Sequence, residues 1–191
     1  MSNKVQYGLK NVHYATLELD ANNAPTFGTP VAWPGAVTLT MDAAGEVTRF
    51  RADNLNYWIG QSNNGYSGNF ESALVPDSFK TDILGFVADK NGVLVEDAEA
   101  QTKPFALLFE FKGDEFETRH VLYHCTASRP SVSGQTTEEQ ITPTTESISI
   151  ETGTVYSSAL GKNIQKASAK KADTPYATWF SQVYLPVAPT T

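Results

Sequence analysis

The sequence lacks the cysteine pairs of disulfide-bonded proteins and the long apolar runs of exported and membrane proteins. Its 191 residues include one cysteine, so no internal disulfide can form. The longest aliphatic and aromatic run is FALLF (105–109), far below the ~20 residues that a membrane span needs. There is no Asn-x-Ser/Thr site and no apolar N-terminal run typical of a signal peptide. We therefore expect a soluble protein that is made inside a cell and is not exported.

Positive charge is also scarce. Fourteen Lys and Arg residues stand against 21 Asp and Glu residues, for a formal net charge of −7. Binding to nucleic acid through phosphate neutralisation requires clustered basic side chains. The composition therefore argues against a nucleic-acid-binding protein, and repulsion from phosphates is the expected default.

What is present is a series of short β-prone runs separated by turn residues, which is typical of a mainly β protein. A strand is predicted at 12–19, a strand-like stretch at 56–75, and a strand at 146–151. Hairpins are predicted at 37–54, around Asp42 to Gly45, and at 86–96, around Asn91 and Gly92. Short helices are predicted at 76–85 and 174–184, and long loops at 20–36 and 130–146. No domain boundary or repeat is evident, so 1–191 is interpreted as one domain with an N-terminal arm at 1–11.

The stretch FKGDEFETRHVLYHC (111–125) holds two of the three histidines and the cysteine. A metal site built on His120, His124 and Cys125 would require a helix. The alternating pattern and the Gly113-Asp114 turn instead predict a hairpin in which Phe111 pairs with Phe116. On a strand, residues four apart lie ~13 Å apart, so the two histidines could not share an ion, and Cys125 would point to the opposite face. We therefore predict a sheet wall without metal or cofactor.

The predicted core residues come from this hairpin and from the first helix. They are Phe105, Leu107, Phe109, Phe111, Phe116, Leu122, Phe79 and Ile83.

Neither of the enzyme motifs considered is convincing. The Gly-rich stretch at 60–68 has the wrong spacing for a nucleophile elbow. Glu110, Glu115 and Glu117 could be imagined as a glycosidase acid pair, but Lys112 and Arg119 beside them favour an exposed ladder of mixed charge. We therefore expect no enzyme activity.

A carbohydrate-binding β-sandwich stays open as an alternative function. In that case exposed aromatic side chains, such as Trp33, Tyr57 and Trp58, would stack on sugar rings.

Several segments, in order along nearly the whole chain, resemble the major tail proteins of long-tailed, non-contractile bacteriophages. They are KVQYGLKNVHYA, RADNLNYW, GYSGNFESALVPDSFKTDILGF, KPFALLFEFKGDEFETRHVLYHCTASRP and TWFSQVYLP. Some members of that family carry an extra C-terminal immunoglobulin-like domain, which we do not expect here because the sequence ends soon after VYLPV.

The resemblance implies a β-sandwich or barrel-like subunit with a flanking helix. It also implies a virion protein that is assembled in the host cytoplasm. Its subunits would form hexameric rings that stack head to tail into the tail tube, around a tape-measure protein and against tail-end proteins. The tube would later conduct DNA during genome ejection without binding it specifically.

Surfaces for such assembly are predicted in the N-terminal arm, in the two long loops and in the one basic cluster. Because lysines on the inner wall would slow DNA, the cluster is expected on the outer surface or at a subunit contact, where it could meet loop acids such as Glu146. A solvated edge strand guarded by lysine is an equally good interpretation. The candidate interface residues are Tyr7, Trp33, Lys162, Lys166, Lys170, Lys171, Glu138 and Glu139.

Overall fold

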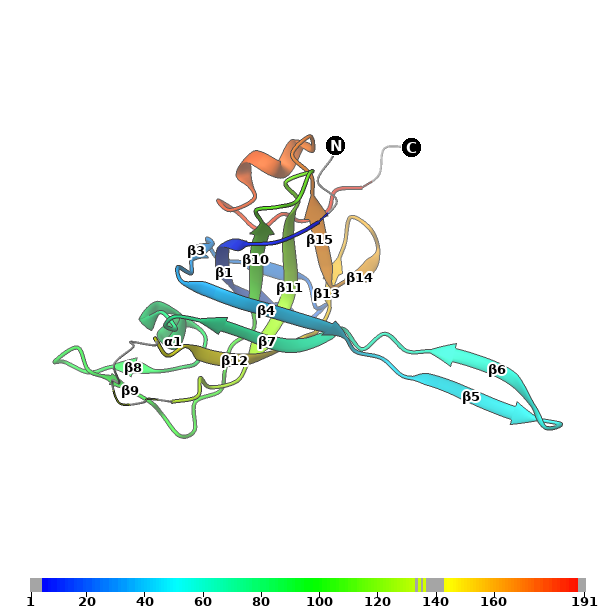
Figure 1. Cartoon of the computed structure of the whole chain (residues 1–191), viewed down its shortest axis with the longest axis horizontal. Helices are drawn as coiled ribbons and strands as arrows, with labels where there is room; N and C mark the ends of the chain where they lie inside the picture. Colours follow the sequence, from blue (N-terminus) through cyan, green and yellow to red (C-terminus); the bar gives the residue numbers. More distant parts are fainter. Residues whose placement is uncertain (1–4, 133, 135, 137–142, 189–191) are drawn as a thin grey trace.

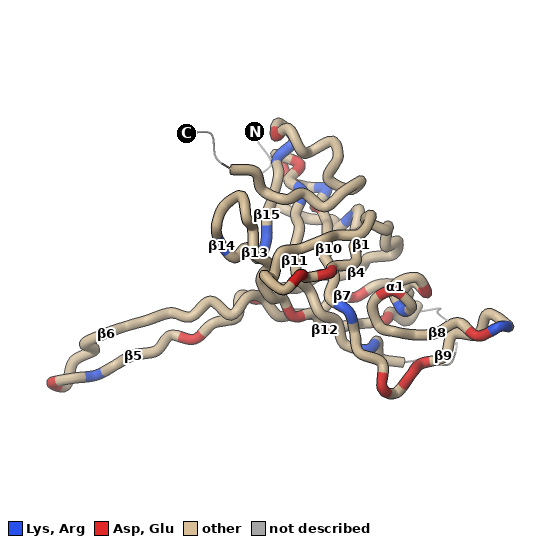
Figure 2. Tube along the Cα trace, turned by 180° about the vertical axis from the view of Figure 1, so that it is seen from behind, with Lys and Arg blue, Asp and Glu red and all other residues tan. Residues whose placement is uncertain are grey.

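The computed structural model describes residues 5–132, 134, 136 and 143–188. Within these residues the chain is mainly antiparallel β-structure with one short α-helix, which confirms the predicted fold class (Figure 1). A long two-stranded hairpin leaves the body on one side, and a smaller one leaves it on the opposite side (Figures 1 and 2).

The body is one bent antiparallel sheet. Its main path runs β2 (Pro25–Phe27), β1 (Leu9–Leu19), β10 (Phe105–Phe111), β11 (Arg119–Ala127), β12 (Glu146–Thr152), β7 (Tyr66–Ser72) and β4 (Ala36–Ala43). Off this path, β3 (Val31–Ala32) pairs with β1, and β15 (Lys166–Ala169) pairs with β11. Strand β11 is the corner, because its first half pairs with β15 and its second half with β12.

The remaining elements lie outside this sheet. Three hairpins are formed by β5 (Val47–Ala52) with β6 (Leu55–Gln61), β8 (Val87–Ala88) with β9 (Leu94–Val95), and β13 (Val155–Ser157) with β14 (Lys162–Ile164). The helices are α1 (Asp77–Asp82) and the 3-10 helix η1 (Thr174–Thr178). The predictions of α1, of the β8–β9 hairpin and of strands β1 and β12 are confirmed.

The larger core fills the inside of the bend. Phe79 of α1 and Phe105 of β10 pack edge to face, with ring centroids 5.1 Å apart. Trp33 lies 4.4 Å from Phe79 and is only 2% exposed, so its predicted place at a subunit interface is wrong. The large indole ring of Trp33 is buried in the core. Strands β2 and β3 lie within the predicted 20–36 loop and pair with β1, which brings this segment into the body.

A second core covers the other side of β1, β10 and β11. The C-terminal segment supplies Trp179, which is buried against this side, and the Tyr123 hydroxyl donates a hydrogen bond to the Tyr184 carbonyl at 2.8 Å. The predicted helix at 174–184 is only the five-residue 3-10 turn η1, with Pro175 in its first turn. Burial on both faces explains why residues 105–109 of β10 are a continuous apolar run rather than an alternating one.

Two predicted hairpin pairings are wrong. Strand β4 pairs with β7 rather than with β5, so no hairpin forms around Asp42 to Gly45. The β10–β11 connection spans 112–118, because Glu110 pairs with Arg119, and not the two residues Gly113 and Asp114. The Asp114 carboxylate accepts backbone N–H bonds from Phe116 and Thr118, and these bonds stabilise the wider turn.

These errors change where particular side chains lie. Phe116 falls in the wider turn and is 52% exposed, so it is not a core residue. A register shift between Phe105 and Leu107 places Cys125 in the larger core with Leu122, and not on the opposite face. Phe111 is only partly buried, whereas the other predicted core residues are buried. They are Phe105, Leu107, Phe109, Leu122, Phe79 and Ile83.

Candidate interaction surfaces

The histidine and cysteine cluster of β11 is part of the sheet wall. His120 stacks on Phe109 with ring centroids 5.2 Å apart, and His124 Nδ1 lies 3.1 Å from the Thr154 carbonyl oxygen. Cys125 is fully buried, and burial raises the pKa of its thiol. Among the described residues no three His, Cys, Asp or Glu side chains are placed to hold a metal ion.

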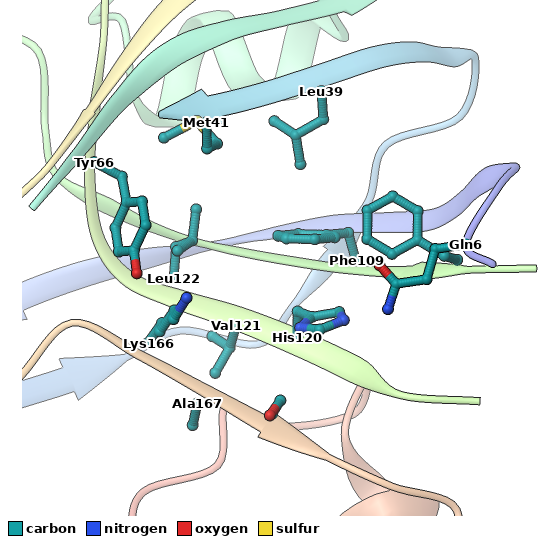
Figure 3. A pocket seen from close by; sticks show the side chains of 12 residues that line it. Gln6, Leu39, Met41, Tyr66, Phe109, His120, Val121, Leu122, Lys166 and Ala167 are labelled. Atoms are coloured by element: carbon teal, nitrogen blue, oxygen red, sulfur yellow. The ribbon is translucent and has the colours of Figure 1, made fainter. Parts of the chain in front are cut away.

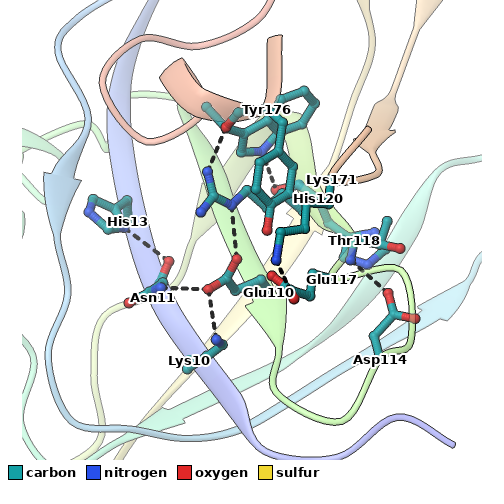
Figure 4. Close-up of polar contacts among 12 residues, drawn as sticks. Lys10, Asn11, His13, Glu110, Asp114, Glu117, Thr118, His120, Lys171 and Tyr176 are labelled. Atoms are coloured by element: carbon teal, nitrogen blue, oxygen red, sulfur yellow. Dashed lines mark hydrogen bonds and ion pairs between the residues drawn. The ribbon is translucent and has the colours of Figure 1, made fainter. Parts of the chain in front are cut away.

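The carboxylate of Glu110 is buried and joins several elements through polar contacts (Figure 4). It accepts hydrogen bonds from Arg119 Nε at 2.9 Å and from Asn11 Nδ2 at 2.5 Å, and lies 3.2 Å from Lys10 Nζ. The guanidinium of Arg119 lies 3.8 Å above the Tyr176 ring. These contacts tie β1, β10, β11 and η1 together, which indicates a structural role rather than a free catalytic acid.

Opposing effects set the ionisation of Glu110. Burial raises its pKa, but the hydrogen bonds from Arg119, Lys10 and Asn11 together outweigh burial and hold the pKa below the ordinary value. Glu117, another of the three carboxylates considered for a glycosidase acid pair, forms an ion pair with Lys171 Nζ at 2.7 Å.

The β5–β6 hairpin, here called the arm (Val47–Gln61), is the largest exposed apolar feature among the described residues. Its turn residues Asp53 and Asn54 have φ of 51° and 64°, as a tight two-residue hairpin turn requires. Strands β5 and β6 pair with each other and with no described strand of the body. The arm therefore extends away from the sheet (Figures 1 and 2). Its exposed apolar side chains are Val47, Phe50, Leu55, Tyr57, Trp58 and Ile59.

Sequence reasoning missed the arm. It placed the turn at Asp42 to Gly45, although Asp53-Asn54 also lies between two β-prone runs. Aspartate and asparagine tolerate positive φ better than other non-glycine residues, and this was the available signal.

A groove of about 570 Å³ opens beside the larger core, and side chains of β4 and β15 line opposite sides of it (Figure 3). Leu39, Met41, Phe109 and Leu122 form much of its apolar wall. Across its rim, Lys166 Nζ lies 4.6 Å from the centre of the Tyr66 ring. Its other lining residues include Gln6, Phe111, His120 and Ser168.

His120 is the unusual polar group of the groove. Its Nε2 atom is buried and has no hydrogen-bond partner among the described residues. Burial lowers the pKa of His120, so its ring is neutral at neutral pH. A buried ring nitrogen without a partner is costly, so this atom marks a place where a further polar group would be stabilising.

Of the predicted interface residues, Tyr7, Lys170 and Lys171 meet at the β10–β11 turn. Tyr7 and the four lysines are exposed, while Glu138 and Glu139 lie outside the described residues. Lys170 lies 4.6 Å from the centre of the Phe116 ring. Within its own chain, Glu146 accepts the Val75 backbone N–H at 2.6 Å. Its contact with lysines of a neighbouring copy stays a prediction.

The prediction of a separate N-terminal segment at 1–11 is also partly wrong, because this segment is not free of the body. Leu9 already belongs to β1, and the Tyr7 and Gly8 carbonyls accept hydrogen bonds from Gly113 and Lys112.

Comparison with protein-family models gives no match, and comparison with curated proteins gives none. Among the helices of the described residues, none has the length and apolar character needed to cross a membrane.

Proposed function

We propose that this chain is a structural subunit that assembles with copies of itself into stacked hexameric rings. These rings would form the tail tube of a long-tailed, non-contractile bacteriophage. The partners in this proposal are other copies of the chain, a tape-measure protein and tail-end proteins, with DNA passing through and not specifically bound. The ordered sequence resemblance supports the hexamer and the phage context.

The arm carries the self-assembly part of the proposal. An isolated two-stranded hairpin is at best marginally stable in water. In addition, the arm carries the apolar side chains of Leu55, Tyr57 and Ile59, which are 70%, 75% and 59% exposed. Such a contiguous apolar surface on a soluble chain typically marks a protein–protein contact. Burying it against another copy would stabilise both the arm and the assembly.

The arm leaves the body on one side and projects beyond it (Figure 1). Where it docks on a different surface of the next copy and the two copies do not exchange arms reciprocally, the contact propagates around rings or along filaments. The acidic balance of the chain suits a conduit for DNA, since phosphates meet few basic groups there.

Sedimentation velocity and negative-stain microscopy of the purified chain over a range of concentrations test the proposal. The expected result is rings or tubes that form above a threshold concentration. Tyr57→Ser with Ile59→Ser should raise this threshold strongly without unfolding the body. Val93→Ser with Val95→Ser is the matched control, because it removes two exposed valines of the other protruding hairpin.

A chain that stays monomeric at every concentration would contradict self-assembly. A monomer that binds glycans through Tyr57 and Trp58 would favour the carbohydrate-binding alternative.

A further inference from the structure

We propose that the groove beside β15 is the receptor for the arm of a second copy, with Tyr57 as its anchor. The inference rests on the proposed self-assembly and assigns the surface that receives the arm. The Tyr57 hydroxyl would donate a hydrogen bond to Nε2 of His120 in the other copy.

The groove is incomplete in a single copy. Its walls are mainly apolar, and side chains from β4, β10, β11 and β15 converge on it (Figure 3). The lone Nε2 of His120 faces no partner among the described residues. Pockets that combine apolar walls with a few placed polar groups are typical binding sites, and a phenol matches both features of this one.

Tyr57 is the most exposed aromatic side chain of the arm, with an exposed fraction of 75%. The Trp58 ring lies over Gly60, where an added Cβ would come within 2.1 Å of Trp58 Cη2. A neutral imidazole has one donor and one acceptor nitrogen, so Nε2 of His120 can accept from a hydroxyl. Tyr57 therefore offers the groove an apolar ring and the missing donor together.

The occupant has to come from another copy. The arm extends away from the body (Figure 1), whereas the groove lies in the body and is lined by residues of β4 and β15 (Figure 3). An arm in one copy and a groove in the next make a contact between unlike surfaces, which leaves a free arm and a free groove for further copies when the two copies do not exchange arms reciprocally. This geometry matches the open assembly that the proposed function requires.

Chemical cross-linking between two differently tagged copies tests the contact. One copy carries Asn56→Cys beside the anchor, and the other carries Ser168→Cys at the groove. Cys125 is fully buried and does not compete for the reagent. A short bis-maleimide should join the two copies under assembly conditions. The matched control replaces Ser168→Cys by Lys90→Cys, on the exposed β8–β9 hairpin, and should give little product.

A second measurement isolates the hydrogen bond. Tyr57→Phe should raise the assembly threshold by about 2- to 10-fold, the effect of one net hydrogen bond. In a His120→Phe background the same change should have no further effect. An equal effect of Tyr57→Phe in both backgrounds would overturn the assignment of His120.

The outcomes separate this inference from the proposed function. Cross-links between copies, together with tubes, support both. Tubes without the Asn56→Cys to Ser168→Cys product overturn the groove assignment and leave self-assembly standing. A cross-link within one chain carrying both cysteines at high dilution shows that the arm folds back, and overturns the inference. Absence of any assembly overturns both.

Discussion

Phe109 lies in β10 and Phe116 in the connection that follows it, and the two phenylalanine side chains have different surroundings. Phe109 is buried between His120 and the larger core, whereas Phe116 is half exposed beneath the Lys170 ammonium. Phe109→Ala should lower the free energy of unfolding by about 3–5 kcal/mol, as for other large core truncations. Phe116→Ala should cost less than about 1 kcal/mol, because it loses mainly an exposed cation–π contact.

Urea unfolding of the two variants measures this difference directly. Equal losses for both would contradict the wide β10–β11 turn. Sequence alone suggested a two-residue turn because glycine and aspartate favour one. The side-chain hydrogen bonds of Asp114 that stabilise the longer turn have no signature in the alternating pattern.

Glu110 predicts a specific pH dependence of stability. Its pKa in the folded chain lies below the ordinary value of 4.5, so the folded state binds its proton less tightly than the unfolded state does. The resulting stability is fully present above about pH 4.5 and is lost as the pH falls through the folded pKa. Glu110→Gln should therefore be less stable than the parent at neutral pH and lose less stability on acidification.

Chemical unfolding at a series of pH values between 3 and 7 checks this prediction. Glu99→Gln, a substitution at an exposed carboxylate, is the matched control and should follow the parent. If Glu110→Gln loses stability on acidification as steeply as the parent does, the carboxylate network is not ionised as described.

Among the elements, the arm should be the least stable in an isolated subunit. Hydrogen exchange of the monomer should be fast at 47–61 and slow in β10 and β11, and assembly should protect the arm. The turn makes a sharper test possible, because proline cannot adopt the φ of 64° at Asn54. Asn54→Pro should disrupt the arm and abolish assembly, while the urea midpoint of the body stays within error.

Asn54→Gly is the matched control, since glycine adopts this conformation without strain. It should assemble at least as well as the parent. Loss of body stability in Asn54→Pro would show that the arm contributes to the fold of its own subunit.

Element types were more predictable than their partners. Helix α1, the β8–β9 hairpin and strands β1 and β12 follow from local turn and periodicity signals. Strand β4 was assigned to the wrong partner because β-prone runs carry no information on which strand they join. The C-terminal segment has helical spacing at Trp179 and Val183, yet packing against the second core holds it in a short 3-10 turn followed by irregular chain.

At the scale of the whole molecule, the mainly β architecture and most of the core could be predicted, but the arm and the groove could not. The groove depends on β4 and β15, which are over a hundred residues apart in sequence and approach only after the sheet bends at β11. His120 packs against Phe109 and Phe111, and its unpartnered ring nitrogen is a property of the folded surroundings.

The proposed tube also constrains where the lysines lie. Lys162, Lys166 and Lys170 are exposed on or just after β14 and β15 and cannot line a DNA channel without slowing its cargo. We expect residues 162–171 to lie away from the tube axis. The inner wall should then be negative or neutral.

Electron cryomicroscopy of the chain concentrated above its assembly threshold would show the assembly itself. We predict stacked sixfold rings, with each arm buried against a neighbouring copy and residues 162–171 away from the axis. A uniform population of monomers or closed dimers with solvent-exposed arms would contradict this prediction.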